Sequence, residues 1–177
     1  MIKIVPFSEQ HRSGVAAVIL PVQQVEFGIP ITLEEQPDLL DIPGFYQKGT
    51  GNFWVALLDD EVVGTVALLD IGNSQGALRK MFVKAPFRGP GHKVALGLLD
   101  ALLKWCACQG VREIYLGTTA KFLAAHRFYE KNRFSEILKS ELPSTFPVMS
   151  VDTKFYRRVL GVADAQGLPA EAAGPNP

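Results

Sequence analysis

Hydrophobic and polar residues alternate with two different periods along the chain, and these periods predict strands and helices. A short alternating segment over 2–7 predicts a first strand, and residues 8–27 have the spacing of an amphipathic helix. Pro21 should kink or split this helix, because proline donates no backbone hydrogen bond. Prolines and glycines break up residues 28–51, so we expect irregular structure there with one short helix over 36–42.

The rest of the chain predicts a run of strands and then alternating helices and strands. Three strands are expected over 52–58, 62–71 and 77–83. Together with the first strand they imply an antiparallel meander. A long amphipathic helix runs from about His92 to Cys108 and ends at Gly110. A strand, a helix and two closing strands follow over 112–118, 121–131, 136–142 and 148–159.

The order of these elements predicts the fold class. A helix separates the strand over 77–83 from the strand over 112–118, so this crossover must be parallel in an otherwise antiparallel sheet. We expect an α/β (α+β) single domain, with a mixed, mostly antiparallel sheet of about seven strands flanked by about four helices. This domain should cover residues 1–160. Residues 161–177 are rich in Ala, Gly and Pro and are expected to form a disordered tail.

Composition and charge exclude several classes of protein. Hydrophobic residues make up 47% and charged residues 20%, and 18 Lys and Arg balance 18 Asp and Glu. A net charge of zero offers no field for nucleic acid or a membrane surface, and no apolar run is long enough to span a bilayer or precedes a signal-peptide cleavage site. Cys106 and Cys108 are too close on a helix to pair, and the histidines are too scattered for a metal site. We therefore expect a cytoplasmic protein that needs no metal.

A glycine-rich turn links the strand that ends at Val83 to the long helix. Its residues 88–93 would direct backbone N–H groups and the positive end of the helix dipole at one point, which suits a phosphate group. Ordinary turn geometry is an alternative explanation for the same glycines. The segment contains neither Gly-X-X-X-X-Gly-Lys-Ser/Thr nor Gly-X-Gly-X-X-Gly, so it is neither an ATP-type loop nor a dinucleotide fingerprint.

Two segments resemble the GNAT acetyltransferase superfamily. Residues 88–93, Arg-Gly-Pro-Gly-His-Lys, are similar to its acetyl-CoA signature, Arg/Gln-X-X-Gly-X-Gly/Ala after a Val-X-Pro strand end. The segment from Ala125 to Phe134 resembles the family's Ala-X-X-X-Tyr-Glu-Lys-X-Gly-Phe. The order of elements over residues 1–160 also matches. The resemblance implies a GNAT-like fold and an N-acetyltransferase, an acyltransferase that moves the acetyl group of acetyl-CoA onto a primary amine.

The resemblance also assigns roles to individual residues. Backbone N–H groups of residues 81–83 would polarise the thioester carbonyl. Tyr129 would be the catalytic general acid that protonates the departing thiolate, since its ordinary pKa near 10 keeps the proton available. The cofactor-binding residues implied by the resemblance are Met81, Phe82, Val83, Arg88, Gly89, Pro90, Gly91, His92, Lys93 and Ala125.

Three positions depart from the family pattern. Lys93 replaces the last small residue of the phosphate loop, where it either adds a positive charge or crowds the site. Phe122 stands where many relatives carry Asn, and Asn132-Arg133 replace X-Gly, although Asn132 can adopt a left-handed cap. These departures keep open a non-catalytic acyl-CoA-binding sensor or interaction domain. A further alternative is an unrelated α/β binding protein with a chance glycine-rich turn.

The acceptor site is expected in the acidic segment 26–41, because by resemblance this region binds the amine. Glu26, Phe27 and Glu34 are its predicted substrate-binding residues, and no Lys or Arg lies between Ser13 and Gln47. An acidic loop would favour a cationic amine, and the alternative is a solvated loop whose acids face water. We expect a small-molecule or peptide amine as acceptor. The general base is not identified, and a homodimer is left open.

Overall fold

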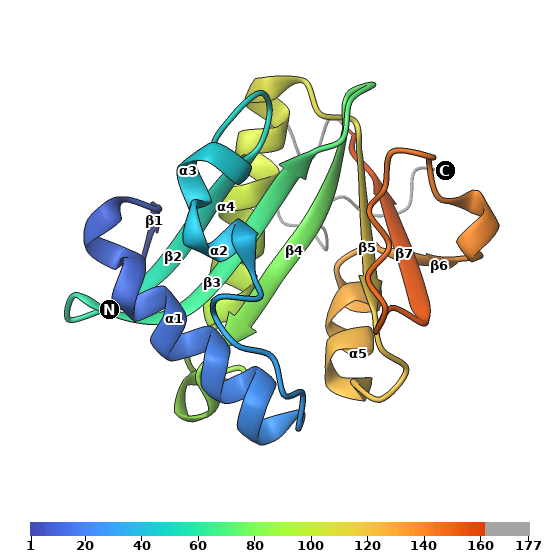
Figure 1. Cartoon of the computed structure of the whole chain (residues 1–177). Coiled ribbons are helices and arrows are strands. Elements are labelled where there is room, and N and C mark those ends of the chain that lie inside the picture. Colours follow the sequence, from blue (N-terminus) through green and yellow to red (C-terminus); the bar gives the residue numbers. More distant parts are fainter. Residues whose placement is uncertain (162–177) are drawn as a thin grey trace. The chain divides into compact units, whose positions relative to one another are not determined.

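The computed structural model describes residues 1–161, and these contain a seven-stranded sheet with the strand order β1-β2-β3-β4-β5-β7-β6 (Figure 1). The fold divides into two compact units. Unit 1 consists of residues 1–69 and 79–102, and unit 2 consists of residues 70–78 and the chain from Leu103 onward. All but the first residue of the expected tail, 161–177, lie outside the described residues.

Unit 1 contains the strands that were predicted from the N-terminal half. They are β1 (Lys3–Pro6), β2 (Asn52–Leu58), β3 (Glu61–Asp70) and the end of β4 (Gln75–Val83). The first two pairs, β1 with β2 and β2 with β3, are antiparallel. Asp59 and Asp60 join β2 to β3 with φ of 49° and 64°, the left-handed pair that a two-residue type I′ hairpin requires. The predicted strand order is confirmed, although helices join β1 to β2.

The helices of unit 1 depart in detail from the single helix predicted over 8–27. Pro21 ends the α-helix, as its missing N–H predicts, and a π-helical turn continues the chain. The elements are a 3-10 helix (Glu9–His11), α1 (Arg12–Pro21), a π-helix (Val22–Glu26), α2 (Pro37–Leu40), α3 (Ile42–Phe45), a 3-10 helix (Ala85–Phe87) and the first part, up to Leu102, of α4 (Val94–Gln109).

The core of unit 1 lies on both sides of its strands. Helices α1, α2 and α3 contribute apolar residues to one cluster with β2, and Figure 1 shows α4 behind the same strands. Gly64 in β3 lets α4 approach closely, since a Cβ atom there would lie 2.8 Å from Val94 Cγ1 and 3.1 Å from Leu98 Cδ1. Because helices cover both faces of these strands, β2 is a continuous apolar run rather than an alternating one.

Unit 2 contains the parallel crossover. In its sheet β5 (Glu113–Thr118) runs parallel to the start of β4, and β7 (Lys154–Val159) runs antiparallel to β5. The short strand β6 (Ser135–Ile137) pairs with β7, and α5 (Leu123–Lys131) precedes it. The parallel pairing confirms the prediction from the helix between the two strands.

The two closing strands are shorter than predicted. The expected strand over 136–142 ends at Ile137, after which a 3-10 helix (Lys139–Glu141) begins. The strand expected over 148–159 begins only at Lys154, because the Asp152 carboxylate accepts a hydrogen bond from the Met149 backbone N–H at 2.9 Å and closes a turn. Apolar residues at the predicted strand positions lie exposed instead. Among residues 1–161, no helix has the length and apolar character to cross a membrane.

Candidate active site

The glycine-rich turn lies where the sequence predicted it, between the end of β4 and the first residue of α4. Gly89 has a φ of 97°, a conformation that side chains other than glycine adopt only with strain. The 16-residue α4 has no acidic residue in its first turn, so its positive end is not neutralised locally. Lys93 directly precedes this helix with a φ of 53°, a left-handed conformation at the position where the family pattern has a small residue.

Arg88 connects this turn to the predicted acceptor segment. Its Nε–H donates to the Val83 carbonyl at 2.8 Å, and its two terminal nitrogens contact the Glu26 carboxylate at 2.9 Å and 2.8 Å. Glu26 closes the π-helix that follows α1. This ion pair therefore joins two residues that the sequence assigned to different sites, the cofactor loop and the acceptor segment.

The strand expected to polarise the thioester contains an irregularity. Lys80 has a φ of 55° inside β4, and its carbonyl accepts a hydrogen bond from the Thr65 hydroxyl at 2.7 Å. A left-handed residue breaks the regular alternation of side chains along a strand, as in a β-bulge. The half-buried residues 81–83 follow immediately. Such irregularities are frequent next to active sites, where they redirect side chains and backbone groups.

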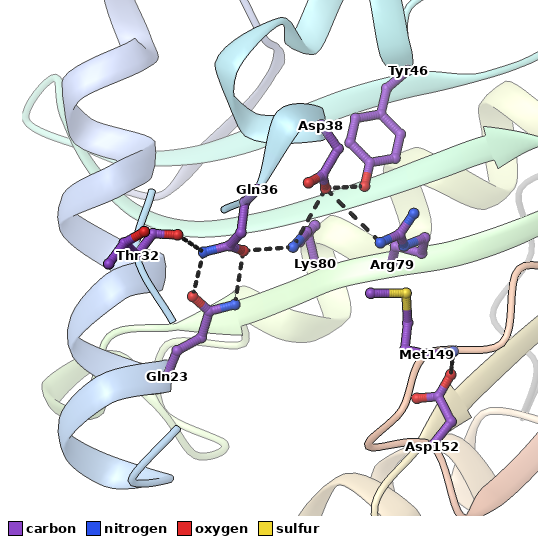
Figure 2. Close-up of polar contacts among 9 residues, drawn as sticks. All are labelled: Gln23, Thr32, Gln36, Asp38, Tyr46, Arg79, Lys80, Met149 and Asp152. Carbon is purple, nitrogen blue, oxygen red and sulfur yellow. Dashed lines mark hydrogen bonds and ion pairs between the residues drawn. The ribbon is translucent and has the colours of Figure 1, made fainter. Parts of the chain in front are cut away.

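The irregularity at Lys80 brings two consecutive cations to one carboxylate (Figure 2). Neighbouring strand residues normally point to opposite faces, yet Lys80 Nζ lies 3.3 Å and Arg79 4.0 Å from the Asp38 carboxylate. The Tyr46 hydroxyl donates to the same carboxylate at 2.6 Å. The Arg79 guanidinium lies 5.8 Å from the ring centre of Phe45 and 5.9 Å from that of Tyr46. Asp38 is thereby held by three side chains.

A pair of glutamines extends this group of residues toward the π-helix. The side chains of Gln23 and Gln36 exchange two hydrogen bonds of 3.0 Å and 2.9 Å, and Lys80 donates to Gln36 Oε1 at 2.9 Å. The Gln36 amide also donates to the Thr32 carbonyl at 3.2 Å (Figure 2). We call Gln36, Asp38, Tyr46, Arg79 and Lys80 the basic cluster.

Burial shifts the pKa values of Lys80 and Tyr46, two members of the basic cluster. The Lys80 side chain is only 10% exposed, and burial lowers its pKa below the ordinary 10.5, against the opposing effect of Asp38. Burial likewise raises the pKa of Tyr46 far above 10, so its hydroxyl stays protonated and donates to Asp38. The cluster is thus a set of mostly buried charges linked by hydrogen bonds.

The expectation of an acidic acceptor segment that favours cationic amines is not supported by these contacts. Glu26 is paired with Arg88, Asp38 is paired with Lys80, and the Asp41 carboxylate accepts from the Gly44 N–H at 3.0 Å. Glu34 is exposed, and so is Phe27, which lies at the end of the π-helix. The carboxylates nearest the basic cluster are therefore already neutralised by cations or bound to backbone.

The sequence did not single out the cations of the basic cluster. A signal was available, because Arg79 and Lys80 are consecutive in a strand predicted over 77–83, and strands of a small domain rarely bury two charges without a purpose. Gln23, Gln36 and Tyr46 carried no such signal, since their partners lie far away in the sequence.

Unit 2 contains the remaining predicted residues. Tyr129 is buried on α5, and its ring packs against Phe134 and Tyr156 at centroid distances of 5.4 Å and 6.1 Å. Burial raises the pKa of Tyr129 above its ordinary 10. Ala125 lies one helical turn earlier and is half-buried. His126 is buried, with Nε2 2.9 Å from the Thr119 carbonyl oxygen.

One expectation about the end of α5 is wrong. Arg133, and not Asn132, takes the left-handed conformation, with a φ of 68°. Asn132 has a φ of −103° and instead closes the helix by donating its side-chain amide to the Phe128 carbonyl at 2.8 Å. Arg133 thus occupies the conformation that the family pattern gives to glycine. Cys106 and Cys108 form no disulfide with each other, as their spacing predicted.

The fold and the glycine-rich turn define a class of acetyltransferases, and comparison with known proteins identifies it. The sequence profile of the Acetyltransferase (GNAT) family matches residues 20–134. An acetyltransferase of the GNAT family from Staphylococcus aureus Mu50 has a similar crystal structure, with a TM-score of 0.85 and 38% identity, covering 91% of this chain and 100% of that one. The chain belongs to the GNAT acetyltransferase family.

Two further similarities are informative. The N-acetylaspartate synthetase of Danio rerio is 38% identical over 106 residues, which are 59% of this chain and 37% of that protein. The chain thus spans little more than a third of the length of this curated relative. The PaiA N-acetyltransferase of Thermoplasma acidophilum, in complex with coenzyme A, shares the fold at 15% identity, with a TM-score of 0.69 over 90% of this chain and 99% of that one.

Proposed function

We propose that this protein transfers the acetyl group of acetyl-CoA to a primary amine. The observation that carries the proposal is the turn of residues 88–93, which matches the acetyl-CoA signature and lies directly before the 16-residue α4 in a chain of the GNAT family. Backbone N–H groups and the helix dipole at this position favour the pyrophosphate of acetyl-CoA.

The chemistry needs few groups from the protein. The neutral amine nitrogen attacks the thioester carbonyl carbon, the carbon–sulfur bond breaks, sulfur takes up a proton and the nitrogen releases one. Backbone N–H groups of residues 81–83 are the proposed donors to the carbonyl oxygen, and Tyr129 is the proposed source of the proton for sulfur. No step requires a metal ion.

The acceptor is a primary amine whose identity is open to test. Curated relatives are named for N-acetylaspartate, which makes aspartate one amine to try first. The non-catalytic acyl-CoA-binding domain is the alternative, because Lys93 stands at a position where the signature has a small residue. A cytoplasmic location and a homodimer stay predictions from the sequence.

Two measurements on the full chain separate these functions. Thermal unfolding with and without CoA measures cofactor binding, and mass spectrometry measures amines that gain an acetyl group in the presence of acetyl-CoA. We expect CoA to raise the unfolding temperature and at least one amine to become acetylated. Stabilisation by CoA without any acetylated amine would favour the binding domain, and the absence of stabilisation would refute both functions.

A further inference from the structure

We propose that the amine acceptor carries a carboxylate group and that Arg79 and Lys80 bind this carboxylate. The inference rests on the proposed function, and it names the class of acceptor that the basic cluster would recognise. Arg79 and Lys80 are consecutive residues of β4 that contact the same carboxylate, and Lys80 adopts a left-handed φ of 55° at this point of the strand. A left-handed conformation in a non-glycine residue persists only where the surrounding structure holds it, and such residues concentrate at functional sites.

Lys80 has hydrogen-bonding capacity for a ligand. An ammonium group has three N–H donors, and among the described residues Lys80 contacts Gln36 Oε1 at 2.9 Å and the Asp38 carboxylate at 3.3 Å. Its side chain is 10% exposed. A carboxylate oxygen would complete the coordination of this ammonium group and would offset the cost of burying its charge.

Arg79 is held in an orientation that suits the same ligand. Its guanidinium lies near the rings of Phe45 and Tyr46, and its side chain is 15% exposed. Stacking on aromatic rings restricts a planar guanidinium, and a planar guanidinium binds a carboxylate through two parallel hydrogen bonds. Two adjacent cations of this kind favour a carboxylate over a neutral or cationic group.

Asp38 and Gln36 position these cations and do not bind the acceptor. The Asp38 carboxylate accepts from Tyr46 at 2.6 Å and contacts both cations, and Gln36 is locked by its paired hydrogen bonds with Gln23. The Asp38 carboxylate is thus already occupied by groups of the protein itself, which fits a positioning role.

The position of the cluster along the chain fits this assignment. Lys80 directly precedes residues 81–83, whose backbone is proposed to hold the thioester carbonyl. In a small amino acid, the amine and the carboxylate are separated by only a few bonds. A carboxylate held at Lys80 would therefore keep the amine within a short distance of the carbonyl carbon, and such positioning accelerates a reaction between two bound groups.

The test compares amino acids with their amides as acceptors. Aspartate, glutamate and β-alanine are assayed with acetyl-CoA beside the matched compounds in which every carboxylate is an amide. We expect the acids to have a kcat/KM at least about tenfold higher, because a hydrogen bond to a charged group is worth about 1.5–3 kcal/mol. Equal kcat/KM for acids and amides would overturn the carboxylate assignment while leaving the transferase function intact. If no amine is acetylated, the proposed function and this assignment both fail.

Variants locate the preference in the basic cluster. Arg79→Met and Lys80→Met should raise KM for the acids roughly 10- to 100-fold, so the ratio of kcat/KM between acids and amides should fall toward one. Because Lys80→Met leaves Asp38 without its closest cation, the double variant Asp38→Asn/Lys80→Gln serves as a second test that removes one negative and one positive charge together. Lys84→Met is the matched control, since Lys84 follows the same strand but is paired with Glu61 at 2.6 Å. An acid preference that survives in folded variants at both cations would refute the assignment.

Discussion

Arg88 and Glu26, which lie 62 positions apart in the sequence, form a two-point ion pair with distances of 2.9 Å and 2.8 Å. The pair ties the turn before α4 to the end of the π-helix, and therefore the proposed cofactor loop to the proposed acceptor segment. Both side chains are more than 30% exposed, so solvent weakens the attraction and the pair contributes at most about 1 kcal/mol. A pyrophosphate group could therefore compete with Glu26 for Arg88.

This competition predicts opposite effects of the two partners on CoA affinity. Arg88→Met should weaken CoA binding about tenfold, because charge-assisted hydrogen bonds to phosphate are lost. Glu26→Gln should leave CoA binding unchanged or tighten it by up to about fivefold, because Arg88 is released from an exposed ion pair. Calorimetric titration measures both. Arg12→Met is the control, since Arg12 forms a similar exposed ion pair with Glu9 at 2.8 Å. CoA affinity that is unchanged in Arg88→Met would show that Arg88 only supports the turn.

Gly91 offers a direct test of the proposed phosphate loop. A Cβ atom at Gly91 would meet no other atom within 4 Å, and its φ is not in the left-handed region, so Gly91→Val should fold normally. The added side chain would keep a phosphate group away from the backbone. We expect CoA affinity to fall at least about tenfold, with an unchanged unfolding temperature. Gly161→Val is the control, because a Cβ atom there also meets nothing within 4 Å. Normal CoA affinity in Gly91→Val would place the pyrophosphate elsewhere.

Local sequence patterns predicted the turn, α4 and the order of the first four strands, because each depends on residues that are close in the sequence. The turn at Asp59 and Asp60 and the end of α4 at Gly110, with its φ of 74°, follow from local backbone preferences. The basic cluster could not be predicted in this way. Asp38 lies in a segment that looked solvated, and its burial depends on Lys80, more than forty residues later in the chain.

The closing strands also show the limit of local sequence patterns, because here the patterns predicted strand residues that the structure does not contain. Apolar residues over 148–151 have the composition of a strand, yet the turn closed by Asp152 leaves them at the surface. The β-propensity of these residues predicted a strand, but the position of the partner strand determines where pairing occurs. Likewise, the left-handed φ of Lys80 has no local cause in the sequence, since lysine does not favour it.

The lowered pKa of Lys80 predicts how acceptor binding depends on pH. Burial reduces this pKa below 10.5, so the ammonium group loses its proton at a lower pH than a free lysine. Carboxylate binding should be complete below this pKa and should weaken as the pH rises through it. Because the unfolded chain binds more protons in this window, the contribution of Lys80 to stability increases as the pH rises through it.

The measurement is KM for an acid acceptor and for its amide between about pH 7 and about pH 10. After correction for the ionisation of the amine, KM for the acid should rise at the alkaline end of this range. KM for the amide should not rise. The Tyr46 hydroxyl, which also contacts Asp38, keeps its proton throughout this range. Parallel profiles for acid and amide would show that Lys80 does not contact the acceptor.

Chelation of metal ions should not affect turnover. Among residues 1–161, no three or more His, Cys, Asp and Glu side chains are grouped in a way that could hold a metal ion, and the proposed transfer requires none. We expect the same kcat with and without EDTA. Loss of turnover that a divalent cation restores would contradict this prediction.

Tyr129→Phe tests the proposed general acid. Burial raises the pKa of Tyr129 above 10, so the hydroxyl holds its proton at neutral pH but gives it up reluctantly to a thiolate, whose own pKa is near 8.5. General acid catalysis contributes about 10²–10⁴-fold at best, and for such an unfavourable transfer we expect kcat to fall roughly 10- to 100-fold. CoA affinity should hold, and stability should change by at most about 1 kcal/mol, because the ring contacts with Phe134 and Tyr156 remain. Tyr115→Phe is the matched control, a second buried tyrosine of unit 2 whose hydroxyl donates to Glu113 at 2.6 Å. Near-normal kcat in a folded Tyr129→Phe protein would make Tyr129 a packing residue, and the proton for sulfur would then come from water.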